Sequence, residues 1–309
     1  MKRIDKIFHY LLRAHSPSPQ LSLPMHKLEP ARFVLRNLLL NALPQSELDR
    51  LLPDLQLVSF SLGQILCESG ERINYCYFPI NAVVSLLYTM QDGSTAEMGL
   101  VGNEGVFGVA AFLGGESTCS TAIVAVAGDA LRVPAQRLQK EFAQAGPLQN
   151  LLLRYAQSLI TQVSQTAVCN RLHSVEQRLC RWLLLCHDRK NCSELLMTQE
   201  LIANMLGGRR ESVTVAARRL QDAGLIRYCR GRIAILDRGG LEISVCECYR
   251  AVENEVNRLF GRRRESEFSS SGGVLAAAAP EAFLADQSCR PELAKRNSQR
   301  PLQHLQRDL

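Results

Sequence analysis

The sequence has no apolar run near the length needed to cross a bilayer. A spanning helix requires about 20 consecutive apolar residues, and no segment of this 309-residue chain comes close. The N-terminal segment is basic, but its apolar stretch is short and is interrupted by His9, which argues against a secretory signal peptide. We therefore expect a cytoplasmic protein that does not interact with membranes.

Metal-binding and catalytic motifs are also scarce. The 11 cysteines are irregularly spaced without any C-x-x-C pair, and Cys246-x-Cys248 has no matching second pair. In a cytosolic chain such cysteines are mostly buried apolar thiols; a zinc or iron–sulfur site is the less favoured alternative, because its ligands usually cluster at short, fixed spacing. No histidine stands in a recognisable catalytic setting, and no glycine loop is suited to hold a phosphate. We expect no metal, no cofactor and no enzymatic activity.

Positive charge is unevenly distributed along the chain. Residues 31–169 carry 8 Lys and Arg against 11 Asp and Glu, whereas residues 170–264 carry 18 against 11, a local net charge of +7. Seventeen of those 18 basic residues are arginine. A basic segment joined to a mildly acidic one is typical of a polyanion-binding module attached to a module with another role. A solvated arginine-rich face without a binding function is the alternative.

The first half of the sequence predicts an all-β unit. Residues 1–30 are rich in proline and serine, and we expect a flexible extension there. Within residues 31–145, short β-prone runs such as YCYFPI and AVVSLLYTM alternate with glycine-containing turns. Many short strands separated by turns favour a β-roll or jelly roll over a parallel α/β sheet.

A long helix is predicted for residues 146–172. Its apolar residues recur at spacings of four and three, which is close to a heptad repeat. We interpret this stripe as a dimer seam. Packing of the helix against its own β-domain is the alternative, and Leu151, Leu153 and Ile160 give the helix a second apolar side. The predicted seam consists of Leu148, Leu152, Tyr155, Leu159 and Val163.

Residues 173–258 contain two short amphipathic patterns that meet at a double glycine. Thr198 is suited to cap the first helix. Gly207-Gly208 is suited to end it, because glycine adopts left-handed backbone conformations at little cost. A second helix is predicted from about Arg209 to Asp222. Because many all-α proteins contain such a helix-turn-helix outline, the side chains must decide its role.

The outward face of the second helix carries charges of both signs. At 100° per residue, Val213, Ala217 and Leu220 mark the buried direction, so the opposite face can project into a DNA groove. Arginine bonds guanine, glutamate accepts a hydrogen bond from cytosine, and a small apolar side chain contacts the thymine methyl group. The predicted base-reading residues are Arg210, Glu211, Thr214 and Val215.

A strand–turn–strand follows the second helix, with Arg230-Gly231 at its predicted tip. We interpret it as an arginine-bearing wing, which favours DNA binding over a structural role. Phosphate contacts fix the position of a protein on DNA without reading sequence. The residues predicted to make them are Thr198, Arg209, Ser212, Arg218, Arg219, Arg230 and Arg232. Residues 259–309 have few large apolar side chains, and we expect a disordered tail there.

The stretch MTQELIANMLGGRRESVTVAARRLQDAGLI resembles the DNA-reading region of the CRP/FNR family of bacterial transcription regulators. By this resemblance Arg210 and Glu211 read bases and Ser212 holds a phosphate, whereas Val215 stands where family members often have arginine. The resemblance covers about residues 35–255 and implies an α+β fold. That fold has an N-terminal cyclic-nucleotide-binding-like β-roll as sensor, a long dimerisation helix and a C-terminal winged helix-turn-helix. The residues that match the family's R-E-[TS]-V core are Arg210, Glu211, Ser212 and Val213.

The resemblance does not extend to the cyclic-nucleotide site. In the family, a Gly-Glu pair takes the ribose hydroxyl, and an Arg-Ser or Arg-Thr pair further along holds the cyclic phosphate. The segment GVAAFLGGESTCSTA retains Gly108 and Ser120, but Val109 replaces the acid and Cys119 the arginine. Because burying a phosphate without a cation is costly, we expect no tight binding of cyclic AMP, and the effector is unidentified. Cys119 is expected to be a small core residue, with a redox role as the alternative.

These features favour a homodimeric, sequence-specific transcription regulator that binds inverted repeats in double-stranded DNA and responds to an effector or signal at the roll. Recognition helices related by a twofold axis would read half-sites about one helical turn apart. RNA polymerase is an expected further partner. The alternative is a ligand-sensing or protein-interaction module that binds nucleic acid without sequence specificity. An enzyme is disfavoured.

Overall fold

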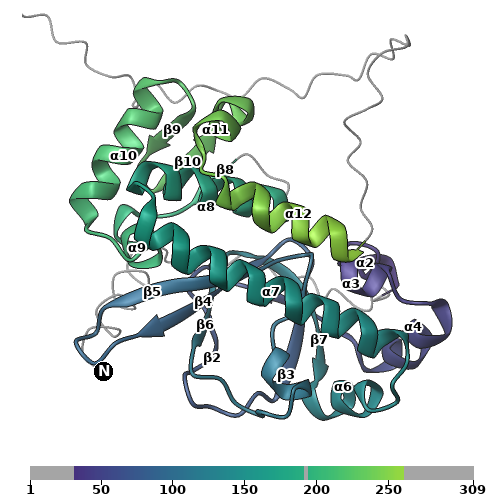
Figure 1. The fold of residues 1–309 in the computed structure, drawn as a ribbon. Coiled ribbons are helices and arrows are strands. Elements are labelled where there is room, and N and C mark those ends of the chain that lie inside the picture. Colours follow the sequence, from purple (N-terminus) through teal and green to yellow (C-terminus); the bar gives the residue numbers. More distant parts are fainter. Residues whose placement is uncertain (1–30, 191–193, 261–309) are drawn as a thin grey trace, which may run out of the picture. The chain divides into compact units, whose positions relative to one another are not determined.

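The computed structural model describes residues 31–190 and 194–260 of the chain (Figure 1). The predicted extension, residues 1–30, lies outside the described residues. The tail predicted for residues 259–309 does so from residue 261 onward, whereas residues 259 and 260 end the last described helix. Within the described residues, no helix combines the length and the apolar character needed to span a bilayer.

Two antiparallel sheets form the predicted β-roll, with the strand orders β1-β7-β3 and β2-β6-β4-β5 (Figure 1). The strands are β1 (Gln56–Phe60), β2 (Ile65–Cys67), β3 (Tyr75–Pro79), β4 (Val83–Thr89), β5 (Thr95–Val101), β6 (Thr121–Val126) and β7 (Gly128–Pro134). The helices before, between and after them are α2 (Ala31–Val34), α3 (Leu38–Asn41), α4 (Gln45–Leu51), the 3-10 turn η1 (Leu52–Asp54), α5 (Val109–Phe112) and α6 (Ala135–Phe142).

The roll is held together by apolar rows on its strands. Phe78 of β3 lies opposite Leu131 of β7, and both are fully buried. Val84 of β4 lies opposite Val124 of β6, and these side chains are buried as well. Because full burial of such a side chain contributes about 1.5–3 kcal/mol, these rows stabilise both sheets.

The long helix α7 (Pro147–Leu172) packs against the roll through the stripe that we predicted to be a dimer seam. Leu148, Leu152 and Tyr155 are at most 4% exposed and belong to the core of the roll. Leu159 and Val163 line a cavity of the roll. The seam prediction is therefore wrong for Leu148, Leu152 and Tyr155, which their own chain covers, whereas Leu159 and Val163 are half-buried at the cavity.

A second apolar row lies on the outward side of α7. Leu153, Ile160 and Val168 are 45%, 66% and 46% exposed. On the opposite side the fit is tight, because a Cβ at Gly105 would collide with the ring of Tyr155. The helix thus buries one apolar side in the roll and leaves another exposed.

The predicted winged helix-turn-helix follows α7 and contains a sheet of order β8-β10-β9. Its first helix, which starts at Val175, begins with a capping box, in which the Ser174 amide donates to Gln177 Oε1 and the Gln177 amide donates to the Ser174 hydroxyl oxygen. The elements are α8 (Val175–Lys190), β8 (Glu194–Leu196), α9 (Gln199–Met205), α10 (Arg210–Asp222), β9 (Ile226–Cys229), β10 (Arg232–Ile235), α11 (Arg238–Ser244) and α12 (Cys248–Phe260).

Helix α8 also contacts the roll through buried polar groups. Glu97 of β5 accepts hydrogen bonds from the Ser85 hydroxyl at 2.6 Å and from the Trp182 indole N–H at 3.3 Å. Burial raises the pKa of Glu97 from 4.5 to about 7. Arg189 pairs with Glu104 at 2.8 Å, and both side chains are buried. This polar joint connects two units that the sequence showed only as neighbours along the chain.

Candidate nucleic-acid interface and roll cavity

The turn between α9 and α10 is built as the sequence predicted. The Thr198 hydroxyl accepts a hydrogen bond from the Leu201 amide at 3.2 Å and so caps α9. Gly207 has a φ of 58°, a left-handed conformation that glycine adopts without a steric penalty. The Gly208 amide donates to the Ala203 carbonyl at 2.9 Å. Together these contacts start α9 at its cap and end it at the double glycine, directly before α10.

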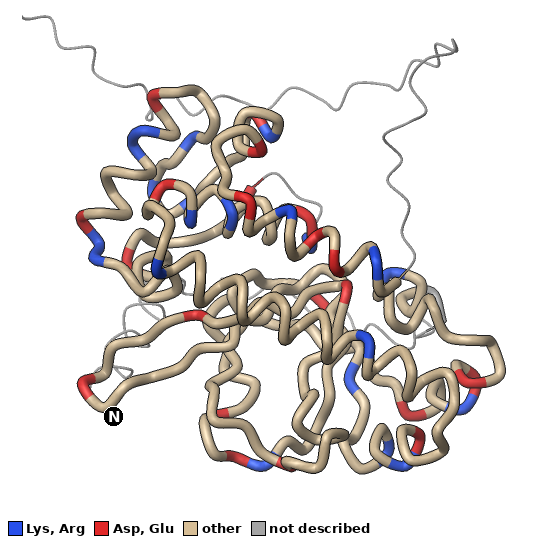
Figure 2. The backbone as a smooth tube through the Cα atoms, viewed as in Figure 1, with Lys and Arg blue, Asp and Glu red and all other residues tan. Residues whose placement is uncertain are grey.

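Helix α10 separates an apolar face from a polar face. Val213, Ala217 and Leu220 are at most 1% exposed and pack into the core of the winged helix-turn-helix. Charges of both signs occur along the helix (Figure 2). The residues predicted to read bases, all of them exposed, are Arg210, Glu211, Thr214 and Val215. This is the geometry that a groove-reading helix requires, since its first turn must reach base edges while its back stays anchored.

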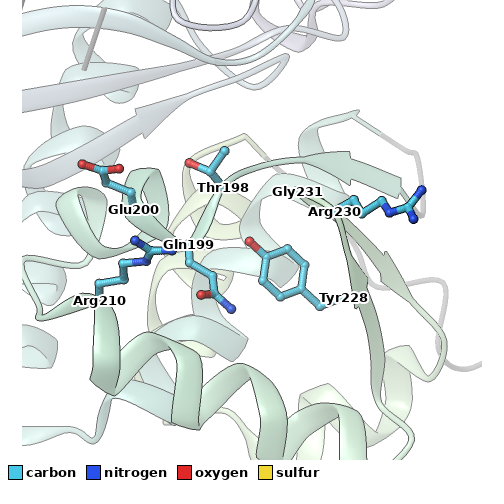
Figure 3. Close-up of a pocket in the computed structure, with 7 residues that line it drawn as sticks. All are labelled: Thr198, Gln199, Glu200, Arg210, Tyr228, Arg230 and Gly231. Atoms are coloured by element: carbon cyan, nitrogen blue, oxygen red, sulfur yellow. The ribbon is translucent and has the colours of Figure 1, made fainter. Parts of the chain in front are cut away.

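A hollow of about 360 Å³ adjoins the start of α10 (Figure 3). The guanidinium group of Arg210 lies beside Gln199, whereas the side chain of Arg230 points away from the other residues drawn (Figure 3). The lining residues are Thr198, Gln199, Glu200, Arg210, Tyr228, Arg230 and Gly231. The hollow therefore brings together the cap of α9, the first residue of α10 and the tip of the wing.

Two residues of this hollow were missed by the sequence interpretation. Gln199 places its side-chain oxygen 2.8 Å from the Thr214 hydroxyl on α10. Tyr228 of β9 donates from its hydroxyl to the Met197 carbonyl oxygen at 3.1 Å. A signal for Gln199 was present, because it directly follows the predicted cap and so opens the helix that packs beside α10. The position of Tyr228 depends on the register of the wing, which the sequence did not specify.

The arginines predicted to bind phosphate are exposed, and three of them have acidic neighbours. Exposed ion pairs contribute little free energy, so a phosphate can replace the carboxylate. The pairs are Arg218–Asp222 at 3.8 Å, Arg219–Glu176 at 3.6 Å and Arg232–Glu194 at 3.6 Å. Arg209 and Arg230 are exposed as well, whereas Ser212 is half-buried at the start of α10. The Thr198 oxygen accepts the hydrogen bond of the cap, and its O–H remains able to donate elsewhere.

The tip of the wing is Arg230-Gly231, as predicted. Cys229 lies opposite Arg232 in the β9–β10 ladder, so the two residues between them make the whole connection. Their φ angles are 46° and 76°, the type I′ geometry that suits the twist of a hairpin. Because few non-glycine residues adopt a positive φ, the turn rather than local preference holds Arg230 at the tip.

A second cavity, of about 180 Å³, lies in the roll. The hydroxyl groups of Tyr88, Thr118 and Ser120 are the polar side chains among its described lining residues, and none of those residues is charged. The predicted pocket and seam residues that line it are Gly108, Val109, Ser120, Leu159 and Val163. The cavity thus combines most of the predicted effector pocket with one side of α7.

Two of the predicted pocket residues have roles that the sequence did not reveal. Gly108 has a φ of 112°, and a Cβ there would lie 2.7 Å from the Cys76 sulfur, so both backbone and space favour glycine. Cys119 is exposed, which corrects the expectation of a core residue. Its thiol donates to the Tyr88 hydroxyl oxygen at 3.4 Å, and this contact raises the pKa of Tyr88. Cys119 therefore reaches the cavity wall through Tyr88.

Two family models match the chain in the same order as its structural units. Residues 57–145 match the cyclic nucleotide-binding domain, and residues 177–243 match the Crp-like helix-turn-helix domain. A curated relative, the global nitrogen regulator of Synechococcus elongatus, is 24% identical over 192 residues, which cover 59% of this chain and 86% of that protein.

Solved structures share the fold. A CRP/FNR-family regulator from Eubacterium rectale matches with a TM-score of 0.53 and 20% identity, over 67% of this chain and 96% of that one. FixK2 from Bradyrhizobium japonicum matches with a TM-score of 0.53 and 16% identity, over 62% and 98% of the two chains. Since a cyclic nucleotide-binding domain precedes a Crp-like helix-turn-helix in one continuous fold, the chain belongs to the CRP/FNR family of DNA-binding transcription regulators.

Proposed function

We propose that the chain is a homodimeric regulator that reads an inverted repeat in double-stranded DNA with the first turn of α10. The observation that carries the proposal is the division of α10 into a buried apolar face and an exposed face that starts with Arg210 and Glu211. These two side-chain types pair with guanine and cytosine edges in the major groove. The exposed arginines of α10 and the wing supply flanking phosphate contacts.

A second copy docks on the outward side of α7 in this proposal. Leu153, Ile160 and Ala167 recur every seven residues and are exposed, so they form one straight apolar row along the helix, as one position of a heptad repeat does. The small Ala167 lets two helices approach closely at one end. This seam replaces the predicted one, whose residues face the roll. Two recognition helices related by the dimer axis would enter successive major grooves about 34 Å apart.

The roll cavity supports an uncharged effector rather than a cyclic nucleotide. Its described lining residues provide no cation to pair with a cyclic phosphate. Leu159 and Val163 form part of the wall, so a ligand there touches the same helix that carries the proposed seam. A ligand changes DNA binding only to the extent that it binds one arrangement of the dimer more tightly than another.

Selection of bound sequences from a random DNA pool tests the proposal. A palindromic site is expected. Arg210→Ala should lose about 1–3 kcal/mol of discrimination at one base pair, whereas Arg230→Ala should weaken binding to specific and random DNA alike. The proposal fails if no symmetric site emerges, or if Arg210→Ala weakens both DNAs equally. DNA binding without any footprint would instead identify a non-specific module.

Ile160→Glu tests the seam separately. A carboxylate placed between two helices would be buried without a partner, so the dimer should dissociate in sedimentation equilibrium. Leu113→Glu changes another exposed apolar residue, 54% exposed, and should leave the dimer intact. A dimer that survives Ile160→Glu excludes this side of α7 as the seam.

A further inference from the structure

Four potential metal ligands meet where the end of α7 lies beside the start of α12. Cys169 lies in the last turn of α7, and His173 follows as the C-cap of the helix, where its amide donates to the Cys169 carbonyl at 3.1 Å. Cys246 and Cys248 lie at the junction of α11 and α12, at separations of 75 to 77 residues from their contacts on α7. One ligand atom from each of these side chains lies within 4.8 Å of all the others.

Two of the separations between ligand atoms match those around a single four-coordinate ion, and all of the separations are at most 4.8 Å. The sulfur atoms of Cys169 and Cys246 are 3.6 Å apart, and the Cys248 sulfur lies 3.5 Å from Nδ1 of His173. Around a tetrahedral zinc ion with Zn–S bonds of about 2.3 Å and a Zn–N bond of about 2.0 Å, neighbouring ligand atoms lie about 3.5–3.8 Å apart. The sulfur–sulfur separation is far longer than the ~2.05 Å of a disulfide. These two contacts therefore have the spacing of ligands in a metal site, and the remaining ligand atoms lie close enough for small side-chain movements to close the set.

Hydrogen-bonding geometry orients His173 as a ligand. Its Nδ1 faces Cys248, while its Nε2 lies 3.4 Å from a carboxylate oxygen of Glu247. A metal-ligating histidine almost always donates its other ring N–H to a carboxylate, a carbonyl or water, which fixes the ring and its tautomer. The segment that supplies two cysteine ligands thus also supplies the group that orients the histidine.

The packing around the cysteines differs from that of the other buried thiols. Cys169, Cys246 and Cys248 are at most 3% exposed and form a small cluster of their own, against which Val245 is partly buried. The two large apolar cores of the described chain do not include them. A cluster this small buries little apolar surface, so apolar packing alone contributes little to holding the three sulfur atoms together. A bound metal ion would supply the missing stabilisation.

A buried cation lies near the cluster. Arg181 of α8 is 7% exposed and interacts electrostatically with Cys169 and Cys248. Three thiolates and a neutral imidazole on a divalent cation leave one net negative charge. A guanidinium group at this position offsets that charge, which lowers the cost of burying the ion.

We propose that Cys169, His173, Cys246 and Cys248 bind one Zn²⁺ ion in a closed, structural Cys₃His site. Zinc favours tetrahedral sets of thiolate and imidazole ligands, and a set with all four positions filled by protein is typical of structural rather than catalytic zinc. The sequence predicted no metal, because Cys246-x-Cys248 had no second close pair; the fold supplies the other half from α7. The ion cross-links the end of α7 to the start of α12. This proposal is independent of which DNA the protein reads.

Metal analysis of the full chain, purified under reducing conditions, tests the site. About one zinc per chain is expected by mass spectrometric elemental analysis. Cys246→Ser and Cys248→Ser should each remove bound zinc, with affinity lowered about 100-fold or more. Cys180→Ser, a buried cysteine on α8, and Cys119→Ser, an exposed one, are the matched controls and should keep it.

Cobalt binding distinguishes cysteines that ligate a metal from cysteines that only pack in the fold, because only thiolate ligands change the visible spectrum of the ion. Chelator-treated protein loaded with Co²⁺ should show thiolate-to-cobalt charge transfer and the strong visible bands of tetrahedral cobalt. Glu247→Gln should retain this spectrum at saturating cobalt but weaken Co²⁺ affinity about 10–100-fold, as expected for a positioning residue. Glu200→Gln, an exposed change on α9, should leave the affinity unchanged.

Several outcomes would overturn the proposal. A folded, reduced chain that takes up neither zinc nor cobalt would do so, as would full retention of metal by Cys246→Ser. Iron with the absorption of an iron–sulfur cluster would replace zinc, and a Cys169–Cys246 disulfide in the chain isolated from cells would replace the metal site altogether. Circular dichroism separates loss of a ligand from loss of the fold. If a serine variant unfolds, removal and return of metal in the intact protein provide the test.

Discussion

The roll cavity and the hollow beside α10 differ sharply in the charge of their walls. The cavity, about 180 Å³, has no charged residue among its described lining. The hollow, about 360 Å³, is lined by Arg210, Arg230 and Glu200 among others. A charge buried without a partner costs several kcal/mol, whereas charges in an open hollow stay hydrated until a phosphate or a base edge replaces the water. The first region therefore suits an uncharged ligand and the second suits a polyanion.

An introduced carboxylate should destabilise the protein far more in the roll cavity than on α10, and this is the largest effect that we predict. Val101 lines the cavity and is 1% exposed, so Val101→Asp should lower the free energy of unfolding by roughly 3–5 kcal/mol. Val215 on α10 is 51% exposed, so Val215→Asp should change it by less than about 0.5 kcal/mol while weakening DNA binding through repulsion of phosphate. Urea denaturation followed by circular dichroism measures both. Similar losses at the two positions would show that the cavity tolerates charge.

The polar joint between α8 and the roll should make the free energy of unfolding depend on pH. Burial raises the pKa of Glu97 to about 7 from 4.5, so the folded state binds more protons between these values and stability falls as pH rises through them. Glu97→Gln cannot ionise, so this part of the pH dependence should disappear and the variant should gain up to about 3 kcal/mol above the folded pKa.

Urea denaturation across a pH series measures the free energy of unfolding of Glu97→Gln and of the native chain. Glu116→Gln alters an exposed carboxylate and serves as the control. Its stability should depend on pH as that of the native chain does. A Glu97→Gln profile that runs parallel to that of the native chain would mean that Glu97 is already ionised in the folded state.

The charged region was more predictable than the apolar one, for physical reasons. In α10, the periodicity of Val213, Ala217 and Leu220 opposes an arginine- and glutamate-bearing face, so only one orientation buries no charge. The cap at Thr198 fixes where the preceding helix α9 starts, and the double glycine separates α9 from α10. Local chemistry alone determines these features, and the structure has them at the predicted positions.

Helix α7 and the cysteine cluster show where local pattern is insufficient. Apolar residues such as Leu152 and Ile160 occur on both sides of α7, so periodicity identifies an amphipathic helix but not which side its own roll covers. Cys169 and Cys246 are 77 residues apart, and their meeting depends on how α12 packs against α7. Cys119 was assigned to the core from its size, although its segment lies at the surface of the roll. Contacts between distant segments are a property of the tertiary fold.

The salt dependence of DNA affinity should distinguish the wing beside the hollow from the roll cavity. Arg230→Ala removes one phosphate-binding charge at the tip of the wing, so the slope of log affinity against log salt should fall by about 1, with a loss of about tenfold at low salt. Val109→Ala enlarges the roll cavity and should leave the slope unchanged. Fluorescence anisotropy at several salt concentrations measures both. An unchanged slope for Arg230→Ala would place the wing away from the DNA backbone.

The smallest effect concerns Thr198, which lines the hollow but also caps α9. Thr198→Ala removes the oxygen that accepts the Leu201 amide, so the free energy of unfolding should fall by about 1 kcal/mol, whereas Thr198→Ser should retain the cap. If the cap is its whole role, DNA affinity measured on the folded fraction is unaffected by either change. A loss of affinity in Thr198→Ala that Thr198→Ser restores would instead assign the hydroxyl a phosphate contact, because the serine O–H can still donate after its oxygen has accepted the amide.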